Sequence, residues 1–471
     1  MSEASELDVA TSPVTEIPVR DEDEHLNRDF IAAVEAAIEA GDQEALRHLA
    51  ADLHEADTGD LLETLQAEDR ASFIRLLGED FDYTALTEID EAVRLQVLED
   101  LPMEVIAEGL GDLDSDDAVY ILEDLNEDDQ AAILGELPYA DRAQLQKALD
   151  YPEESAGRRM QTEFIAVAPF WTIGQTIDYM REARDLPDSF YEIYVVDPTF
   201  KLLGSVHLDK ILRTKRDEKV TSIMEETRQA VLATEDQEEV ARRFERYNLV
   251  SSAVVDENDR LVGVLTVDDI VDVIQEEAEE DLRALAGVGD EEISDNVMTI
   301  ARSRLTWLVV NLFTAVLASV VIAFFEDTIE AMVALAVLMP IVASMGGNAG
   351  TQTMTVAVRG IATQELGARN LLRILNREIM VSVFNGVALA ILIGVTAWLW
   401  FGNPGLGVVI GGAIVINLLF AGLSGLLIPI ALDKLNVDPA IASSVFVTTV
   451  TDVVGFFAFL GIAALWFGLP F

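Results

Sequence analysis

The stretch IASSVFVTTVTDVVGFFAFLGIAALWFG, residues 441–468, decides the class of this protein, because it is long and apolar enough to cross a bilayer yet holds a carboxylate, Asp452, in its interior. A lone charge at that depth costs about 3 kcal/mol or more to insert. No Lys or Arg lies in the interior of any predicted span to neutralise it. The simplest partner is a cation in transit, so this stretch predicts a cation pathway.

Four further apolar segments precede this stretch, so the last third of the chain predicts five membrane spans, at about residues 304–325, 331–358, 379–401, 406–432 and 441–468. Arginines gather in the loop between the second and third spans, and the opposite loops are acidic or neutral. Because basic loops stay in the cytoplasm, the N-terminal two thirds should be cytoplasmic. We therefore expect a multi-pass protein of the inner or plasma membrane, with the lipid bilayer around it.

Charge divides the chain near residue 302. Seven basic and eight acidic residues follow residue 300, a net charge of −1, whereas the first 300 residues hold 24 basic and 76 acidic ones, a net charge of −52. Such acidity argues against nucleic acid as a partner, because nucleic-acid binding needs basic patches. Two readings stay open: a soluble region that collects divalent cations, and adaptation to high salt. The chain has no cysteine, which excludes disulfides and thiolate metal sites.

Residues 1–25 contain no apolar run and predict a disordered acidic tail, not a signal peptide. Residues 26–157 are rich in Leu, Ala and Glu, with a short repeat. The repeat reads VLEDL, GLGDL, ILEDL and ILGEL, ending at Leu101, Leu113, Leu125 and Leu137, a period of 12 residues. Short helices stacked as a small superhelix would bury these apolar stripes. An irregular helical bundle is the alternative.

Residues 160–275 alternate β-branched runs with amphipathic helices and contain an internal duplication. Val195-Val196-Asp197 returns as Val254-Val255-Asp256, and Leu208-Asp209-Lys210-Ile211 returns as Val267-Asp268-Asp269-Ile270, always 59 residues later. Each copy predicts a strand, a glycine turn, a strand and a helix start with Asp in its first turn. This pattern resembles a tandem pair of CBS domains, which are α/β regulatory modules.

The predicted architecture is therefore multidomain: a helical superhelical N-domain, an α/β CBS pair, a long connecting helix and a five-helix transmembrane domain. The expected boundaries are 1–25 for the tail, 26–157 for the N-domain, 158–222 and 223–274 for the two CBS domains, 275–302 for the acidic connecting helix, and 303–471 for the transmembrane domain.

Polar groups inside the spans are the candidates for ion binding. In PIVASMGGNAGTQT, residues 340–353, Asn348 and Gln352 (with Thr351 between them) can offer oxygens, and the glycines permit close helix approach. Helix packing alone is the alternative for this segment. Thr448 lies four residues before Asp452 and so on the same helix side, and Gly455 leaves room beside them.

The GGNAGTQ segment after a membrane proline, the Asp in the fifth span, the CBS pair and the acidic connecting helix together resemble the MgtE family of magnesium channels. The resemblance covers nearly the whole chain from about residue 30. It implies a homodimer with a pore on the two-fold axis, closed by cytosolic Mg²⁺. It places the selectivity carboxylate at Asp452, with backbone near Thr448 and Gly455 contributing.

For the gate, the resemblance implies that the family's "plug" helix corresponds here to the connecting helix. Its carboxylates match Asp272, Glu277, Glu280 and Asp281, with Asp269 just before them and Asp116 as the N-domain ligand. For each acid the alternative is a solvated surface charge. Bridging by Mg²⁺ would overcome repulsion between such carboxylates, about 4 kcal/mol for one pair at 4 Å.

Three positions depart from the family pattern. Asn248 stands where an Asp is frequent, Thr84 where another N-domain acid is expected, and Arg158-Arg159 where Gly is usual. CBS pairs in general can bind adenine nucleotides, and Thr266 with Asp269 would suit a ribose, so ATP is a weaker expectation for this pair.

Two other functions stay open, and an enzyme is not expected because no nucleophile–base set or P-loop is present. One is a broader transporter of Co²⁺ or Ni²⁺, against which the lack of Cys and the four His argue. The other is a membrane-anchored CBS nucleotide sensor. Asp452 argues against it, because a passive anchor does not need a carboxylate inside the membrane.

Overall fold

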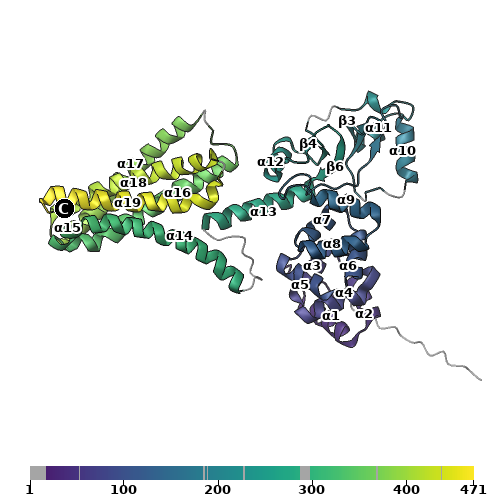
Figure 1. Cartoon of the computed structure of the whole chain (residues 1–471), viewed down its shortest axis with the longest axis horizontal. Helices are drawn as coiled ribbons and strands as arrows, with labels where there is room; N and C mark the ends of the chain where they lie inside the picture. Colours follow the sequence, from purple (N-terminus) through teal and green to yellow (C-terminus); the bar gives the residue numbers. More distant parts are fainter. Residues whose placement is uncertain are drawn as a thin grey trace, which may run out of the picture. The chain divides into compact units, whose positions relative to one another are not determined.

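The computed structural model describes residues 17–470 apart from 52, 184–185, 188, 226–228, 287–296, 368–369 and 436. The chain forms two compact units, Met1–Val273 and Ile274–Phe471. The first unit holds the N-domain and the CBS pair, and the second holds the long helices (Figure 1).

The N-domain is a stack of short helices, as the sequence predicts. They are α1 Arg28–Ala40, α2 Gln43–Ala50, α3 Glu55–Thr64, α4 Ala67–Leu77, the 3-10 turns η1 Gly78–Asp80 and η2 Tyr83–Leu86, α5 Glu91–Asp100, α6 Met103–Gly111, α7 Ser115–Glu123, α8 Glu127–Glu136 and α9 Tyr139–Leu149. Helices α5 to α9 begin 12 residues apart, so each repeat unit is one helix. The repeat leucines Leu101 and Leu137 end α5 and α8 and are buried in a continuous apolar core.

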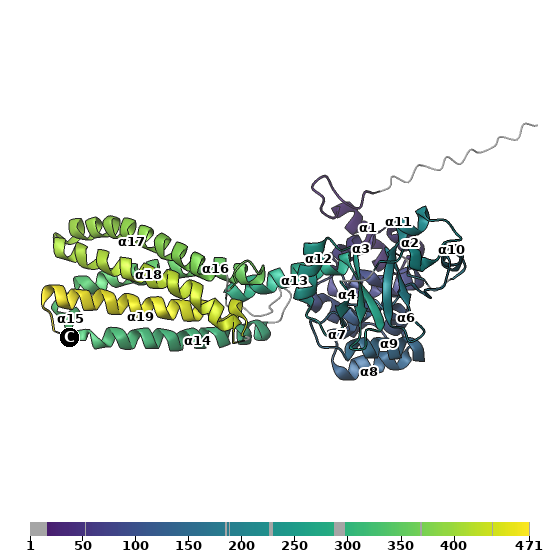
Figure 2. The same cartoon turned by 90° about the horizontal axis from the view of Figure 1, so that it is seen from above.

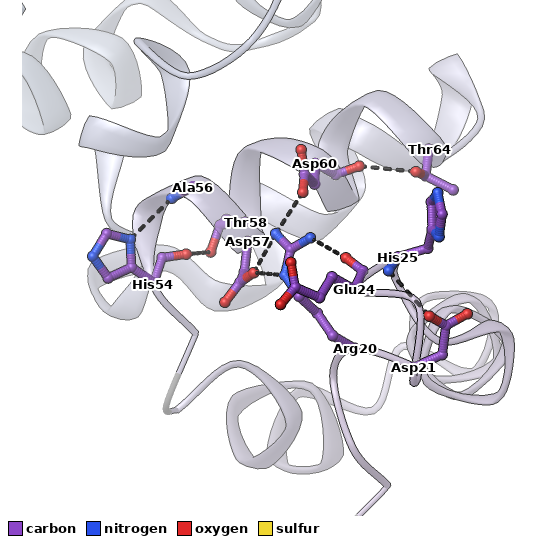
Figure 3. A network of polar contacts seen from close by, with 10 residues as sticks. All are labelled: Arg20, Asp21, Glu24, His25, His54, Ala56, Asp57, Thr58, Asp60 and Thr64. Atoms are coloured by element: carbon purple, nitrogen blue, oxygen red, sulfur yellow. Dashed lines mark hydrogen bonds and ion pairs between the residues drawn. The ribbon is translucent and has the colours of Figure 1, made fainter. Parts of the chain in front are cut away.

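Part of the expected N-terminal tail is held against this stack. Residues 1–16 lie outside the described residues. Arg20 pairs with Asp57 and Asp60 of α3 at 2.6 Å each, and its guanidinium also donates to the Glu24 carbonyl at 2.7 Å (Figure 3). A bridge between Arg20 and Leu26 closes the loop, and Arg20 ties this loop to α3.

The CBS pair consists of two similar α/β modules. Their elements are β1 Ala166–Val167, α10 Ile173–Glu182, β2 Glu192–Val196, β3 Leu202–His207, α11 Leu208–Arg213, the turn η3 Val220–Ser222, β4 Val231–Leu232, α12 Gln237–Tyr247, β5 Ser251–Val255, β6 Leu261–Thr266 and α13 Val267–Ala286. The sheets have the orders β1-β2-β3 and β4-β5-β6, each with one parallel and one antiparallel pairing. The pairs Val195↔Gly204 and Val254↔Gly263 repeat at the predicted offset of 59, and the bulges beside them do too.

The glycines of the duplication do not form the turns, contrary to the sequence prediction. Gly204 and Gly263 lie inside β3 and β6. A Cβ on Gly204 would meet the Glu225 carbonyl at 2.3 Å, and one on Gly263 would meet the Gln161 carbonyl at 2.8 Å, so both positions favour glycine. The turns instead contain Phe200 and Asp259, whose backbones adopt the left-handed conformation with φ of 65° and 59°.

The second unit is a helical bundle made of α14 Val297–Phe324, the short α15 Glu326–Ala331, α16 Ala334–Ala362, α17 Leu371–Phe401, α18 Pro404–Asp433 and α19 Pro439–Phe467. Among the described residues, the five long helices α14 and α16 to α19 are long and apolar enough to span a membrane, as predicted. Helix α18 packs against α16, α17 and α19, and α14 packs against α19 (Figure 2). Most of the apolar stretch of α18 is buried, so α18 is the centre of the bundle.

Helix α13 belongs to both units. It begins at Val267, inside the expected second CBS domain, and ends at Ala286, whereas residues 287–296 of the expected connecting segment lie outside the described residues. Within the second unit, Ala284 near its end is buried with Met354 and Val358 of α16 and with Ala440 and Val447 of α19. The connecting helix therefore packs its last turn on the transmembrane bundle.

Candidate functional site

Asp452 lies in the middle of α19 and is partly buried. Among the described residues, no cation forms an ion pair with its carboxylate and no group donates a hydrogen bond to it. Thr448, one turn earlier, is exposed, and its hydroxyl donates to the Ser444 carbonyl at 2.9 Å. The hydroxyl proton is thus used within the helix. The oxygen lone pairs of Thr448 remain able to accept hydrogen bonds or to contact a cation beside Asp452.

The segment with Asn348 and Gln352 lies on α16, which packs closely on α19. A Cβ on Gly350 would lie 2.5 Å from Val447 Cγ1 and 3.5 Å from Thr451 Cγ2, so this glycine allows the contact. Asn348 and Gln352 are exposed within the single chain and share one side of α16, four residues apart. The structure therefore brings both candidate segments to one helix pair and leaves Thr448, Asn348 and Gln352 exposed within the single chain.

Gly455, which the sequence places near Asp452 on α19, faces α18. A Cβ there would lie 2.7 Å from Asn417 Nδ2 of α18. The space at Gly455 is therefore filled by the Asn417 side chain.

A second candidate site lies in the first unit, where α7 and α13 begin. Asp116 and Asp117 are in the first turn of α7, and Asp268 and Asp269 are in the first turn of α13. Burial raises the pKa of Asp116 well above its usual value, and the charge of Asp269 raises it further. One Asp116 oxygen, Oδ1, is buried and accepts no hydrogen bond within the described residues. The structure thus brings together the two predicted ligands Asp116 and Asp269.

Neighbouring acids belong to the same electrostatic cluster. Burial, with Asp269 as the next cause, raises the pKa of Asp117 to about 7. Burial also raises the pKa of Asp269 to about 6, although the Thr266 hydroxyl donates a hydrogen bond to its Oδ2. Sequence reasoning missed Asp117, although its place beside Asp116 in an acidic helix start was a visible signal.

The cluster continues along α13 and toward α3. The pKa of Asp272 is raised by desolvation and by Asp268 and lowered by Arg159. The pKa of Glu88 is raised by burial and then by Asp272. The other predicted plug acids, Glu277, Glu280 and Asp281, lie on the part of α13 that belongs to the second unit.

These acids do not form a ready-made metal cage. Within the part of the chain that the structure describes, no three His, Asp or Glu side chains converge so as to hold a metal ion. Mg²⁺ does not need such a cage, because it usually keeps several waters and uses one or two carboxylates. The unpaired Asp116 oxygen and the desolvated like charges around it fit a hydrated divalent cation.

Polar contacts fix α7 against the CBS pair beside this cluster. The Ser115 hydroxyl donates to Glu163 at 2.8 Å, and the Gln161 amide donates to Asp114 at 2.6 Å. Arg159, whose role the sequence left undefined, lies 3.4 Å from Glu123 of α7 and donates to Gln237 of α12 at 3.1 Å. Arg159 therefore joins the N-domain to the second CBS module.

The remaining departures have local explanations. Asn248 ends α12 in the left-handed conformation with φ of 51°, which asparagine tolerates well. Thr84 lies in η2, where its amide donates to Asp82 at 3.0 Å. Neither position touches the Asp116 cluster through a contact that the structure describes.

A cleft lies between the two CBS modules and is lined by Glu163, Tyr194, Ser251 and Thr266 among others. The buried hydroxyls of Tyr194 and Ser251 lack a well-formed hydrogen bond within the described residues. Thr266 lines the cleft, and Asp269 reaches it through the hydrogen bond to Thr266. A small polar ligand could satisfy these hydroxyls.

Comparison with known proteins agrees with this organisation. Three family descriptions match in chain order: an MgtE intracellular N domain at residues 53–154, a CBS domain at 220–276 and an MgtE divalent cation transporter domain at 339–462. The magnesium transporter MgtE of Bacillus subtilis strain 168 is 33% identical over 413 residues, which cover 88% of this chain and 92% of that protein. Its counterpart from Thermus thermophilus is 32% identical over 463 residues, 93% of this chain and 99% of that protein.

Among solved structures, the cytosolic domain of the Mg²⁺ channel MgtE in complex with ATP matches with a TM-score of 0.49 at 30% identity, over 52% of this chain and 99% of that one.

Proposed function

The chain belongs to the MgtE family of magnesium transporters, and from this premise we propose that it is a Mg²⁺-selective channel for magnesium uptake that closes when cytosolic Mg²⁺ binds its soluble carboxylates. The observation that carries the proposal is Asp452, a carboxylate in the middle of a membrane-spanning helix with no ion-pair partner in the described part of the chain. Membership of a transporter family also confirms the expectation that the chain is not an enzyme.

The pathway would run beside Asp452. A carboxylate in a membrane needs water or a cation, and Mg²⁺ passes most readily with part of its hydration shell in place. Oxygens of Thr448 and of the backbone near Gly455 would contact the waters of such an ion on the same helix. The absence of cysteine and of histidine from the second unit's sequence favours this hard cation over Co²⁺ or Ni²⁺.

We further propose a homodimer. Asn348 and Gln352 are exposed on α16, and lipid cannot satisfy their amides. A second copy facing this side of α16 would cover the amides and add a second Asp452 to a shared pathway. The arginines at the end of α16 and the start of α17, Arg359, Arg373 and Arg377, support a cytoplasmic first unit at the inner or plasma membrane.

The gate would depend on the acids at the start of α13. Without a divalent cation, the charges of Asp116 and Asp269 repel each other, which favours separation of α7 from α13. A hydrated Mg²⁺ held by these carboxylates would neutralise them and keep α13 in place. Because Ala284 at the other end of α13 packs on α16 and α19, the position of this helix can bear on the transmembrane bundle.

A nucleotide is the second ligand that the geometry favours. The cleft between the CBS modules presents the buried hydroxyls of Tyr194 and Ser251 together with Thr266, and these polar groups suit the sugar hydroxyls of an adenosine group. Asp269 would then serve both sites, because Thr266 bonds one of its oxygens. A membrane-anchored sensor without transport would leave Asp452 unexplained.

The test is Mg²⁺ flux into liposomes for the wild type, Asp452→Asn and the control Asp438→Asn, at low and high Mg²⁺ on the side of the soluble unit. Asp438 caps the start of α19 by accepting from the Ala440 amide at 2.7 Å, a contact that asparagine preserves. We expect Asp452→Asn alone to abolish flux and high Mg²⁺ to suppress the wild type. Undiminished flux in Asp452→Asn would refute the pathway, and wild-type flux that ignores Mg²⁺ would refute the gate.

A further inference from the structure

Asn417 is a polar residue at the centre of the bundle that the proposed pathway does not yet use. It lies in α18 with no exposed surface. Its Nδ2 donates a hydrogen bond of 2.9 Å across to the Val342 carbonyl of α16. Its Oδ1 is equally buried and accepts no hydrogen bond from the described residues.

Two glycines on two other helices are shaped around this side chain. A Cβ on Gly346 of α16 would lie 2.2 Å from Asn417 Nδ2, and one on Gly455 of α19 would lie 2.7 Å from the same atom. Both distances are too short for any side chain to share the space. Asn417 therefore fills the point where α16, α18 and α19 approach one another.

Packing alone does not account for an asparagine at this point. Leucine has nearly the same branched shape, needs no partner in an apolar interior, and would leave no unpaired oxygen. Interhelical hydrogen bonds in membranes contribute little on average, so the single bond to Val342 scarcely offsets that oxygen. The presence of asparagine is better explained by its contacts with α16 and α19, whose positions it fixes.

Both glycines adjoin the proposed ion-binding groups. Gly346 begins the turn of α16 that carries Asn348, and Gly455 is three residues after Asp452 on α19. We propose that Asn417 is a positioning residue for ion selectivity: its amide sets the depth and spacing of the α16 and α19 segments that face the ion. This inference rests on the proposed function, because it assigns a role within that pathway.

The test compares Asn417→Leu with the wild type, using Ser424→Ala as the matched control. Ser424 is a buried polar residue of the same helix, but its hydroxyl bonds only within α18, to the carbonyls of Phe420 and Ala421. The measurements are Mg²⁺ flux against Mg²⁺ concentration, the ratio of Mg²⁺ to Ca²⁺ flux, and the Tm of the purified protein.

For Asn417→Leu we expect the Mg²⁺ concentration at half-maximal flux to rise, or the Mg²⁺ to Ca²⁺ ratio to fall, by roughly threefold or more, which equals about 0.6 kcal/mol. The Tm should stay equal or rise, because an unpaired buried oxygen is removed. A purely structural residue would give the opposite pattern, with both flux quantities unchanged whatever the Tm. Ser424→Ala should change neither flux quantity.

If leucine prevents folding, Asn417→Ala removes the same hydrogen bond without adding bulk, and it is measured in the same way. Unchanged selectivity and half-maximal concentration in a folded Asn417→Ala protein would overturn the inference. A wild type that carries no Mg²⁺ would overturn the proposed function itself, and this failure is distinct because it appears before any variant is compared.

Discussion

Replacing Asp117 by asparagine should stabilise the start of α7 at high pH when no divalent cation is present. The pKa of Asp117 is raised to about 7 by burial and by Asp269, against about 3.9 in an unfolded chain. The folded state therefore binds this proton more tightly than the unfolded state. The free energy of unfolding is highest below pH 4, falls as the pH rises to about 7, and is constant above it.

The size of the effect follows from the two pKa values. At pH 8 the ionised Asp117 lowers the free energy of unfolding by up to about 4 kcal/mol relative to a neutral side chain, and at pH 5.5 by about 2 kcal/mol. Asp117→Asn removes this loss at both values of pH. Its advantage over the wild type should thus halve between pH 8 and pH 5.5.

Hydrogen–deuterium exchange on the full-length protein can measure this locally, since amide exchange reports the free energy of opening for each segment. In Mg²⁺-free buffer at pH 8, peptides covering α7 should exchange more slowly in Asp117→Asn than in the wild type. Adding Mg²⁺ should slow the wild type more than the variant, because less repulsion remains to be neutralised. Asp128→Asn, an exposed acid in the first turn of α8, is the control and should change neither result.

One outcome would refute this reasoning. If α7 in Asp117→Asn exchanged as fast as the wild type or faster at pH 8 without Mg²⁺, the carboxylates would not be destabilising this contact. The electrostatic basis of the gate would then fail, whatever the flux measurements showed.

Three other changes test separate parts of the structure. Gly350→Ala should lower the free energy of unfolding of the bundle by about 1–3 kcal/mol, since its Cβ would meet Val447 Cγ1 at 2.5 Å; the Tm in detergent measures this, and an unchanged Tm would contradict the close contact. Arg159→Gln removes the cation that joins Glu123 of α7 to Gln237 of α12, so several-fold more Mg²⁺ should be needed to suppress flux; an unaltered Mg²⁺ dependence would exclude this role. Thr266→Val should weaken the binding of adenosine to the purified protein about tenfold, as measured by calorimetry. An unchanged affinity would show that adenosine does not bind in this cleft.

Periodic features of the chain could be predicted from the sequence, because each depends on residues that are close together in the chain. The four units of the 12-residue repeat became helices α5 to α8 at the same spacing, and the offset of 59 returned in the strand registers. The five spans followed from length and hydropathy.

Contacts between distant segments could not be predicted in this way. Asn417 bonds Val342, 75 residues away, and no local pattern encodes which helix its amide will meet. Gly204 and Gly263 were predicted to be turn glycines, because the sequence shows the residue type but does not show that a distant backbone segment packs against each of them. The pairing of Asp116 with Asp269 was expected only through the family resemblance, because the two residues lie on different domains.

The acids of the first unit are of two kinds, exposed and buried. This difference bears on the two explanations that composition left open, adaptation to high salt and binding of divalent cations. Solvated surface acids suit high salt and cost little, because water and ions screen them. Asp116, Asp117 and Asp269 are different, since burial and the charges of neighbouring acids raise the pKa of each. Solubility gains nothing from charges that are withdrawn from water and destabilise the fold. Salt adaptation can therefore account for the exposed acids, whereas the cluster between α7 and α13 requires a bound cation or protons.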